Sequence, residues 1–170
     1  MRIVIVEDEV QTREGLSRLI ERIDPRYRVV GSAANGQKGL ELIYDKRPDV
    51  VITDIKMPFM DGLELSDILK KKMPKIQIII LSGYGEFDYA KEAIKIGVTD
   101  YLTKPVTGEQ LLEALNKVKQ KLDKKKRQEE DRKKMENSRA AVWKCGGRQN
   151  KNSAAGDELQ KTQQNEEIDG

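Results

Sequence analysis

The sequence predicts an α/β fold, an open doubly wound sheet of five parallel strands, from two observations. Apolar runs rich in Val and Ile recur along the first 120 residues. Such runs, without in-out alternation, are typical of parallel strands covered on both faces. Segments with apolar residues at helical spacing separate the runs, as the crossover connections of parallel strands require. Strand and helix alternate five times, which predicts helices on both faces of one sheet.

Each predicted strand is followed by one predicted helix. The strands are Ile3–Val6, Tyr27–Ala33, Val50–Ile52, Ile76–Leu81 and Val98–Leu102, of which Tyr27–Ala33 has the weakest pattern. The apolar positions that share a helix face are Leu16, Leu19, Ile20 and Ile23; Leu40 and Ile43; Leu63, Ile68 and Leu69; Ala90, Ala93 and Ile94; and Leu111, Leu115, Val118 and Leu122. Each of these stripes is expected to pack on the sheet.

Length and composition indicate one folded domain followed by a tail. The 170 residues are 36% charged and 37% apolar, which argues against a second core of full size. We expect the domain to cover residues 1–120 and a basic helical extension or linker to cover residues 121–145, with its helix ending at about Ala141. Residues 119–151 hold 13 basic and 5 acidic side chains. A disordered polar tail is expected over residues 146–170.

The residue inventory excludes several classes of function. The chain has no histidine, so Ser-His-Asp catalysis, histidine-ligated zinc and a phosphohistidine on this chain are excluded. Its one cysteine, Cys145, cannot form an internal disulfide, which suits a reducing cytosol. No apolar run reaches the roughly 18 residues of a membrane span, and no signal-peptide pattern opens the sequence. The expected location is therefore the cytoplasm.

Candidate functional residues lie at the carboxyl ends of four predicted strands. Glu7 and Asp8 end the first strand, Asp54 the third, Ser82 the fourth, and Lys104 follows the fifth. Ligands of open α/β sheets bind at this edge. Each residue alone is more often a helix cap, a turn residue or an exposed lysine. All of them in this order predict a functional site.

The chemistry of these side chains limits which ligands the site can bind. Two like charges 4 Å apart repel by about 4 kcal/mol at an effective dielectric near 20, so clustered carboxylates need raised pKa values or a cation. Oxygen ligands without histidine or thiolate suit Mg²⁺. An aspartate can act as a nucleophile toward phosphorus, and phosphoryl transfer depends mainly on positioning and charge neutralisation. A magnesium-dependent phosphoryl site is therefore predicted.

Five motifs follow one another in the first 120 residues: Val4-Ile5-Val6-Glu7-Asp8-Glu9, Asp49 through Pro58, Met60-Asp61-Gly62, Leu81-Ser82-Gly83-Tyr84 and Asp100 through Pro105. With these motifs, residues 1–120 resemble the receiver domain of bacterial two-component response regulators. The stretch from Ser82 to Ala90 further resembles the subgroup fused to AraC-type DNA-binding modules. The resemblance implies a flavodoxin-like sheet of order 2-1-3-4-5.

The resemblance also implies roles for individual residues. Asp54 would accept a phosphoryl group from a sensor histidine kinase, while Asp8, Asp54 and the backbone carbonyl of Lys56 would ligate Mg²⁺. Glu7 would lie next to these ligands without contacting the ion, or it would reach the ion through water.

The remaining implied roles concern the switch that follows phosphorylation. Ser82 would hydrogen-bond the phosphoryl group, Lys104 would pair with its charge, and the bond between Lys104 and Pro105 would be cis. The loop from Gly83 to Glu86 would follow Ser82, and Tyr101 would be the switch aromatic. Homodimerisation would use the face made by the fourth helix, fifth strand and fifth helix.

The sequence departs from the family pattern in three ways. Glu7 stands where Asp is commoner, Ser82 replaces the commoner Thr, and no DNA-binding module follows residue 120. We therefore expect a phosphorylation-activated switch without turnover catalysis, which controls transcription through an output domain absent from this chain. The alternative is a stand-alone receiver that acts by protein binding or phosphorelay without DNA contact.

Two further functions are weaker. A phosphatase with an aspartate nucleophile usually carries a second acid two residues later, where this chain has Lys56. The basic segment Lys119–Lys134 could contact nucleic acid, but it lacks interleaved aromatics, so a solvated helix or linker is favoured. The apolar stripe that begins at Leu111 ends too soon for a coiled coil.

Overall fold

The computed structural model describes residues 1–83 and 87–146, and within them it contains one parallel sheet of order β2-β1-β3-β4-β5. The strands are β1 (Arg2–Val6), β2 (Arg28–Ala33), β3 (Val50–Asp54), β4 (Gln77–Ser82) and β5 (Asp100–Thr103). The helices are α1 (Val10–Ile23), α2 (Gly36–Lys46), α3 (Gly62–Lys72), α4 (Phe87–Ile96) and α5 (Gly108–Gly146). The predicted doubly wound α/β fold and its strand order are confirmed.

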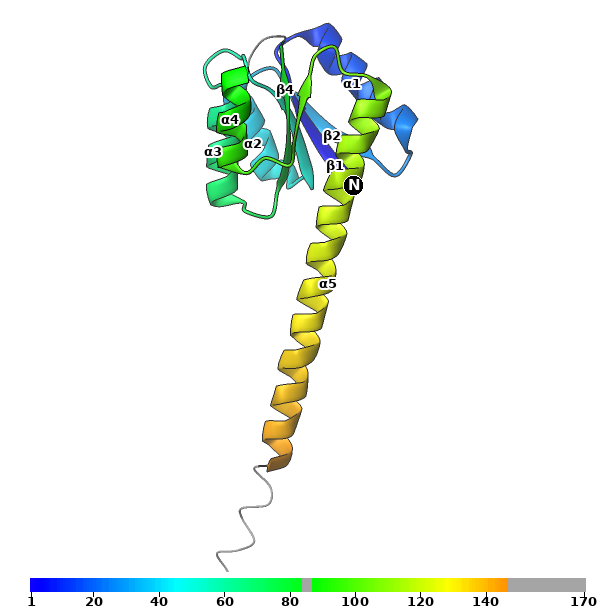
Figure 1. The fold of residues 1–170 in the computed structure, drawn as a ribbon, viewed down its shortest axis with the longest axis vertical. Helices are drawn as coiled ribbons and strands as arrows, with labels where there is room; N and C mark the ends of the chain where they lie inside the picture. The colour runs from blue at the N-terminus through cyan, green and yellow to red at the C-terminus, as the bar shows by residue number, and fades with distance from the viewer. Residues whose placement is uncertain (84–86, 147–170) are drawn as a thin grey trace, which may run out of the picture. The chain divides into compact units, whose positions relative to one another are not determined.

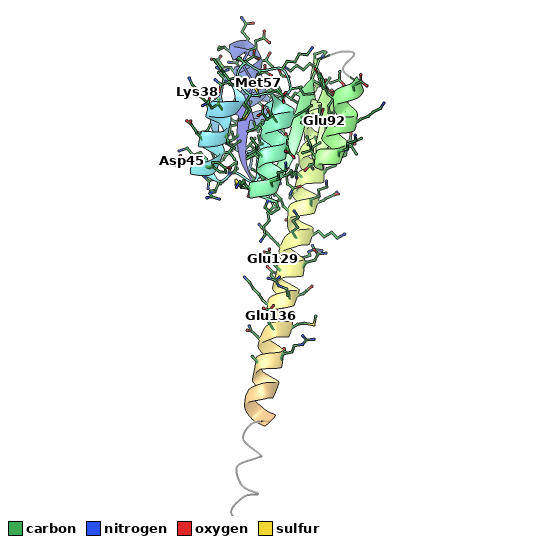
Figure 2. The ribbon with its side chains drawn as sticks, turned by 90° about the vertical axis from the view of Figure 1, so that its left-hand side faces the viewer. Lys38, Asp45, Met57, Glu92, Glu129 and Glu136 are labelled. Carbon is green, nitrogen blue, oxygen red and sulfur yellow. The ribbon has the colours of Figure 1, made fainter. Side chains whose placement is uncertain are left out.

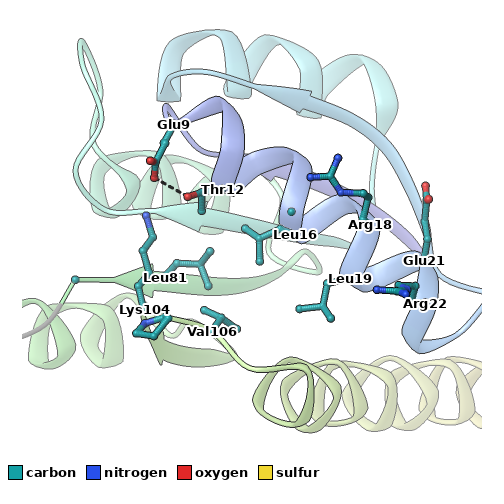
Figure 3. Close-up of a pocket in the computed structure, with 13 residues that line it drawn as sticks. Glu9, Thr12, Leu16, Arg18, Leu19, Glu21, Arg22, Leu81, Lys104 and Val106 are labelled. Carbon is teal, nitrogen blue, oxygen red and sulfur yellow. Dashed lines mark hydrogen bonds between the residues drawn. The ribbon is translucent and has the colours of Figure 1, made fainter.

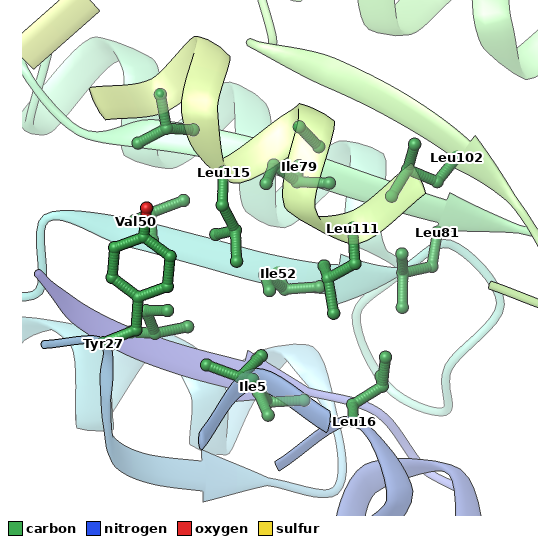
Figure 4. Packing of buried hydrophobic residues seen from close by; sticks show 14 residues of the cluster. Ile5, Leu16, Tyr27, Val50, Ile52, Ile79, Leu81, Leu102, Leu111 and Leu115 are labelled. Atoms are coloured by element: carbon green, nitrogen blue, oxygen red, sulfur yellow. The ribbon is translucent and has the colours of Figure 1, made fainter. Parts of the chain in front are cut away.

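The sheet separates two hydrophobic clusters. Figure 1 shows α2, α3 and α4 on one side of the sheet, with α1 and the beginning of α5 on the other. Alternate residues of β1 face opposite sides of the sheet, so that Ile3 and Ile5 belong to the first cluster and Val4 and Val6 to the second cluster. In the cluster of Figure 4, residues of α1 and α5 pack on Ile5 and Ile52. Burial on both faces explains why the strands read as continuous apolar runs.

The structure corrects the predicted stripe of α4. Ala93 is fully buried, but Ile94 is 76% exposed. The buried side of the helix is formed instead by Tyr89, Ala93 and Ile96, which pack against the second cluster. Successive residues on a helix lie about 100° apart, so Ala93 and Ile94 cannot both point directly at the sheet.

The start of β5 is also later than predicted. Gly97 ends α4 with a φ of 81°, and the N–H groups of Gly97 and Val98 both donate to the carbonyl of Ala93. Val98 therefore belongs to the helix cap, and the strand begins at Asp100. This left-handed cap favours glycine, because a Cβ would be strained there.

The last helix reaches further than expected. The chain divides into two units, Met1–Leu122 and Asp123–Gly170, so the first unit ends where the apolar stripe of α5 ends. The helix continues to Gly146, beyond the expected end at Ala141. A charged pair one turn apart supports it, in which Arg132 lies 3.7 Å from Glu136, a residue labelled in Figure 2. The rest of the predicted polar tail, residues 147–170, lies outside the described residues.

In the part of the chain that the structure describes, no helix combines the length and apolar composition needed to cross a membrane.

The turn after β3 requires a residue without a side chain. The Gly62 N–H donates to the Ile55 carbonyl at 2.8 Å, and a Cβ on Gly62 would lie 1.9 Å from the carbonyl oxygen of Asp54. Asp61 caps α3 by accepting from the N–H groups of Leu63 and Glu64. The Asp-Gly pair therefore starts α3 directly against the backbone of β3.

We expect Gly62→Ala to destabilise the first unit by about 1–3 kcal/mol or more, because the strand end would have to move. Gly15→Ala is the matched control, since a Cβ there meets no other atom within 4 Å. That substitution in the interior of α1 should stabilise the protein by about 0.5–1 kcal/mol. Urea unfolding followed by circular dichroism measures both. Equal midpoints for Gly62→Ala and wild type would contradict the steric assignment.

Candidate functional site

Strand register brings the predicted site residues to one edge of the sheet. Val6 of β1 pairs with Thr53 of β3, and Asp54 pairs with Leu81 of β4, next to Ser82. β1 is the strand from which the chain winds both ways, to β2 on one side and to β3 on the other. In open sheets, the crevice at such a reversal is the usual ligand site.

Lys104 joins two of the acidic side chains. Its Nζ lies 2.8 Å from Oε2 of Glu7 and 3.0 Å from Oδ2 of Asp54. Its backbone N–H donates to the carbonyl of Ser82 at 2.7 Å, which fixes the start of the loop after β5. The next peptide bond, between Lys104 and Pro105, is cis. The ammonium group is therefore held between the ends of β1 and β3.

Three carboxylates converge at this edge. One oxygen from each of Glu7, Asp8 and Asp54 lies within 4.8 Å of the other two. The Glu7 side chain is 1% exposed and that of Asp54 is 10% exposed, whereas Asp8 is exposed. The site thus has a buried floor, made by Glu7 and Asp54, and an acidic rim at Asp8.

Burial sets the electrostatics of this cluster. It raises the pKa of the Glu7 carboxyl, and the nearby Asp54 charge adds to the rise while the hydrogen bond with Lys104 opposes it. Burial likewise raises the pKa of Asp54 despite its contacts with Lys104 and the Ile55 N–H. For Lys104, burial lowers the pKa, but hydrogen bonds to both carboxylates outweigh it and the net pKa is raised. One ammonium therefore compensates two buried acids only in part.

Other expected site residues lie around this centre. Ser82 is buried, and its hydroxyl donates to the Gly83 carbonyl at 3.0 Å. Tyr101 is half-buried and packs against the second hydrophobic cluster. Lys56 is exposed and lies in the loop after β3. Of the loop expected to follow Ser82, residues 84–86 lie outside the described residues.

Arg13 is an addition to the residues expected from the sequence. Its Nη1 donates to the backbone carbonyl of Glu7 at 2.5 Å and to that of Asp8 at 3.3 Å. Arg13 lies one turn into α1, close to a helix end where the dipole favours acidic side chains. A basic residue at that position was the signal available in the sequence.

Two hollows lie beside the centre. The larger, of about 1000 Å³, runs along α1 from Glu9 and Lys104 over Leu16, Leu19 and Val106 (Figure 3). The smaller, of about 330 Å³, is lined by Asp8, Ile55, Lys56, Met57, Pro58, Asp61 and Tyr89. The larger hollow therefore reaches the site at Lys104, and the smaller one reaches it at Asp8.

Residues 3–116 match the family model of the response regulator receiver domain. This chain belongs to that family. Among solved structures, the receiver domain is similar to the REC domain of AraT, a response regulator from Geobacillus stearothermophilus, with 40% identity and a TM-score of 0.69 over 74% of this chain and 97% of that one. It is also similar to a DNA-binding response regulator of the LuxR family from Staphylococcus aureus, with 32% identity and a TM-score of 0.65 over 69% and 97% of the two chains.

Curated relatives of the receiver domain are regulatory proteins by name, and several of them are named as transcriptional regulatory proteins. The uncharacterized transcriptional regulatory protein YesN of Bacillus subtilis is 43% identical over 117 residues, which are 69% of this chain and 32% of YesN. The positive alginate biosynthesis regulatory protein of Pseudomonas aeruginosa is 42% identical over 118 residues, 69% of this chain and 46% of that protein. The chain thus spans less than half the length of each of these two relatives.

Asp54→Asn is expected to raise the melting temperature of the metal-free receiver domain at neutral pH by about a few degrees. The raised pKa of Asp54 means that its folded-state contribution is favourable below the unfolded pKa and is lost as pH rises through the folded one. The advantage of the variant should therefore shrink as pH falls toward about 4. Thermal unfolding in EDTA across this pH range tests it.

Asp45→Asn provides the control for this prediction. Asp45 is exposed on α2, and its pKa is lowered by the hydrogen bond from Lys46, so its removal should give no stabilisation at neutral pH (Figure 2). A melting temperature of Asp54→Asn at or below wild type at pH 7 would contradict the expected cost of the buried charge.

Proposed function

We propose that this receiver domain is a phosphorylation-activated switch that accepts a phosphoryl group on Asp54 from a sensor histidine kinase, in a Mg²⁺-dependent reaction in the cytoplasm. The observation that carries the proposal is the place of Asp54. Its carboxylate lies at the end of β3, 3.0 Å from the Lys104 ammonium and within reach of Asp8 and Glu7. These 170 residues contain no histidine, so the phosphohistidine donor has to lie outside them, and we propose that it belongs to the kinase.

The proposed donor set fits Mg²⁺. Asp8 and Asp54 offer carboxylate oxygens, and the backbone carbonyl of Lys56 is proposed as a third oxygen ligand, which together match the preference of Mg²⁺ for hard ligands with water completing the shell. Glu7 forms an ion pair with Lys104, so we propose that it lies next to the metal ligands without contacting the ion, or that it reaches the ion through water. When bound, the ion would neutralise charge on the phosphoryl oxygens.

The transfer step follows from the Asp54 contacts. An oxygen lone pair of Asp54 forms the new O–P bond while the P–N bond of the phosphohistidine breaks, and protonation lets the donor ring leave as neutral imidazole. The Ile55 N–H donates to Oδ1 at 2.8 Å and Lys104 contacts Oδ2, so the carboxylate is oriented before the donor arrives. Catalysis here consists of positioning and charge compensation.

The proposed switch uses Ser82, Lys104 and Tyr101. A phosphoryl group on Asp54 adds charge and acceptor oxygens. The Ser82 hydroxyl would turn from the Gly83 carbonyl to a phosphoryl oxygen, and Lys104 would pair with the new charge. Tyr101 would move further into the second cluster, against which it already packs. The exposed face of α4, β5 and α5 would then change and form a homodimer.

The larger hollow and the names of the relatives support the proposed partners. The hollow along α1 opens beside Lys104, which makes it the proposed contact for the kinase (Figure 3). Relatives such as YesN are named as transcriptional regulators, and this chain matches 32% of YesN. We therefore propose that the switch controls transcription through an output domain and that only this domain contacts DNA. The resemblance of the stretch from Ser82 to Ala90 makes the AraC type the proposed one.

Asp54→Asn should abolish acyl-phosphate formation with acetyl phosphate and Mg²⁺, because the amide is not a nucleophile for phosphorus. Intact-mass measurement should show the gain of one phosphoryl group in wild type and in Asp45→Asn, and none in EDTA. Undiminished labelling of Asp54→Asn would reject this residue as the acceptor.

Lys104→Ala should impair the switch more than it impairs metal binding. The variant loses the cation that pairs with the phosphoryl group but keeps the proposed metal ligands. We expect Mn²⁺ affinity to change by less than about threefold, a shift under roughly 1 kcal/mol, while dimerisation on phosphorylation is lost in light-scattering measurements. Equal loss of both properties would refute the role given to Lys104.

A further inference from the structure

We propose that Arg13 is a positioning residue of the metal site, which holds the backbone at the end of β1 so that the Glu7 and Asp8 carboxylates face Asp54. The inference rests on the proposed function, because it assigns Arg13 a role in the same magnesium site. The guanidinium does not contact the carboxylates in the hydrogen bonds described; it acts on them through the backbone of the turn.

The hydrogen bonds of Arg13 place it directly behind the acidic pair. Nη1 donates to the carbonyl oxygen of Glu7 at 2.5 Å and to that of Asp8 at 3.3 Å. Pairing of this segment with β2 reaches the Glu7 N–H, which donates to Ala33 at 3.0 Å. After Glu7 the chain turns and enters α1, and Arg13 binds the carbonyls of Glu7 and Asp8 where this turn begins.

The orientation of the Glu7 side chain depends on this turn. The Glu9 N–H donates to Oε1 of Glu7 at 3.3 Å, while Oε2 of Glu7 meets Lys104 at 2.8 Å. The first contact comes from the turn that Arg13 holds, and the second comes from the loop after β5. A change in the turn would therefore rotate the Glu7 carboxylate and move Asp8, which is next to it in the chain.

Arg13 occupies a place where its charge is unfavourable for the helix itself. The positive end of the α1 dipole is at Val10, and no acidic residue stands in the first turn. The Glu9 side chain does not cap the helix but accepts from the Thr12 hydroxyl at 2.5 Å. Helical side chains point toward the helix N-terminus, so Arg13 reaches back to β1. The carbonyl contacts account for a cation at this position.

Positioning and simple electrostatics predict opposite effects on metal affinity. If Arg13 acts only through its charge, removing it leaves a more negative site, and a divalent cation should bind more tightly. If Arg13 holds the turn, removing it displaces two carboxylates, and affinity should fall. Residues that orient metal ligands typically contribute 10–100-fold to affinity. The sign of the change therefore separates the two roles.

The test is Mn²⁺ binding to the full chain, followed by electron paramagnetic resonance. Arg13→Met should weaken Mn²⁺ binding by about tenfold. Arg13→Lys, which keeps a charged donor, should recover most of that affinity, and Arg13→Gln, a neutral side chain with an N–H donor, should fall between them. Arg18→Met is the matched control on the same helix, because Arg18 is 70% exposed and pairs only with Glu14 at 3.6 Å in the described contacts. Its Mn²⁺ affinity should equal that of wild type.

Unfolding midpoints in urea are measured on the same samples, so that affinity is compared only among folded variants. If Arg13→Met does not fold, Arg13→Gln carries the test, with weaker binding than wild type as the supporting result. Unchanged or tighter Mn²⁺ binding by the folded neutral variant overturns the inference.

Failure of the inference is distinguishable from failure of the proposed function. Wild type that binds Mn²⁺ and gains a phosphoryl group from acetyl phosphate, together with neutral Arg13 variants that bind Mn²⁺ equally well, overturns only the role of Arg13. Wild type that neither binds Mn²⁺ nor gains the phosphoryl group overturns both.

Discussion

A single ammonium group lies between two carboxylates that are almost fully withdrawn from water. Lys104 contacts Glu7 and Asp54 at 2.8 and 3.0 Å, and both acids have raised pKa values because burial outweighs this compensation. The metal-free site therefore carries an excess of negative charge that the fold tolerates at a cost in stability. A divalent cation would remove that cost, and a phosphoryl group could then approach. The same electrostatic imbalance underlies both parts of the proposed reaction.

The sheet keeps the carboxylates at the ends of β1 and β3 close together despite their repulsion. Residues on both faces of the central strands are fully buried, so the ends of β1 and β3 cannot separate to relieve repulsion between their carboxylates. Backbone contacts reinforce the same edge. Gly62 packs directly on the carbonyl of Asp54, and Arg13 binds the carbonyls of Glu7 and Asp8. The backbone that carries the acidic side chains is thus held by groups that take no part in the proposed chemistry.

The sequence was sufficient to predict the architecture because burial leaves a local pattern. Continuous Val and Ile runs identified the parallel strands, and the apolar stripe that stops at Leu122 predicted where packing on the sheet ends. Patterning was less informative at the surface of the helices. Ile94 fits the same stripe as Ala93 but is exposed, and α5 continues past its predicted end at Ala141, which the apolar pattern did not indicate.

The sequence by itself determined the fold class, the order of the strands along the chain and the residue types at the strand ends. Only the tertiary structure decided that Lys104 pairs with Glu7 as well as Asp54, that the Ser82 hydroxyl turns to Gly83, and that Arg13 binds the end of β1. The physical reason is how far along the chain each kind of information extends. Periodicity records which side of an element is buried, whereas these contacts join segments far apart in the chain or depend on how a turn closes, and both are set by strand register and packing.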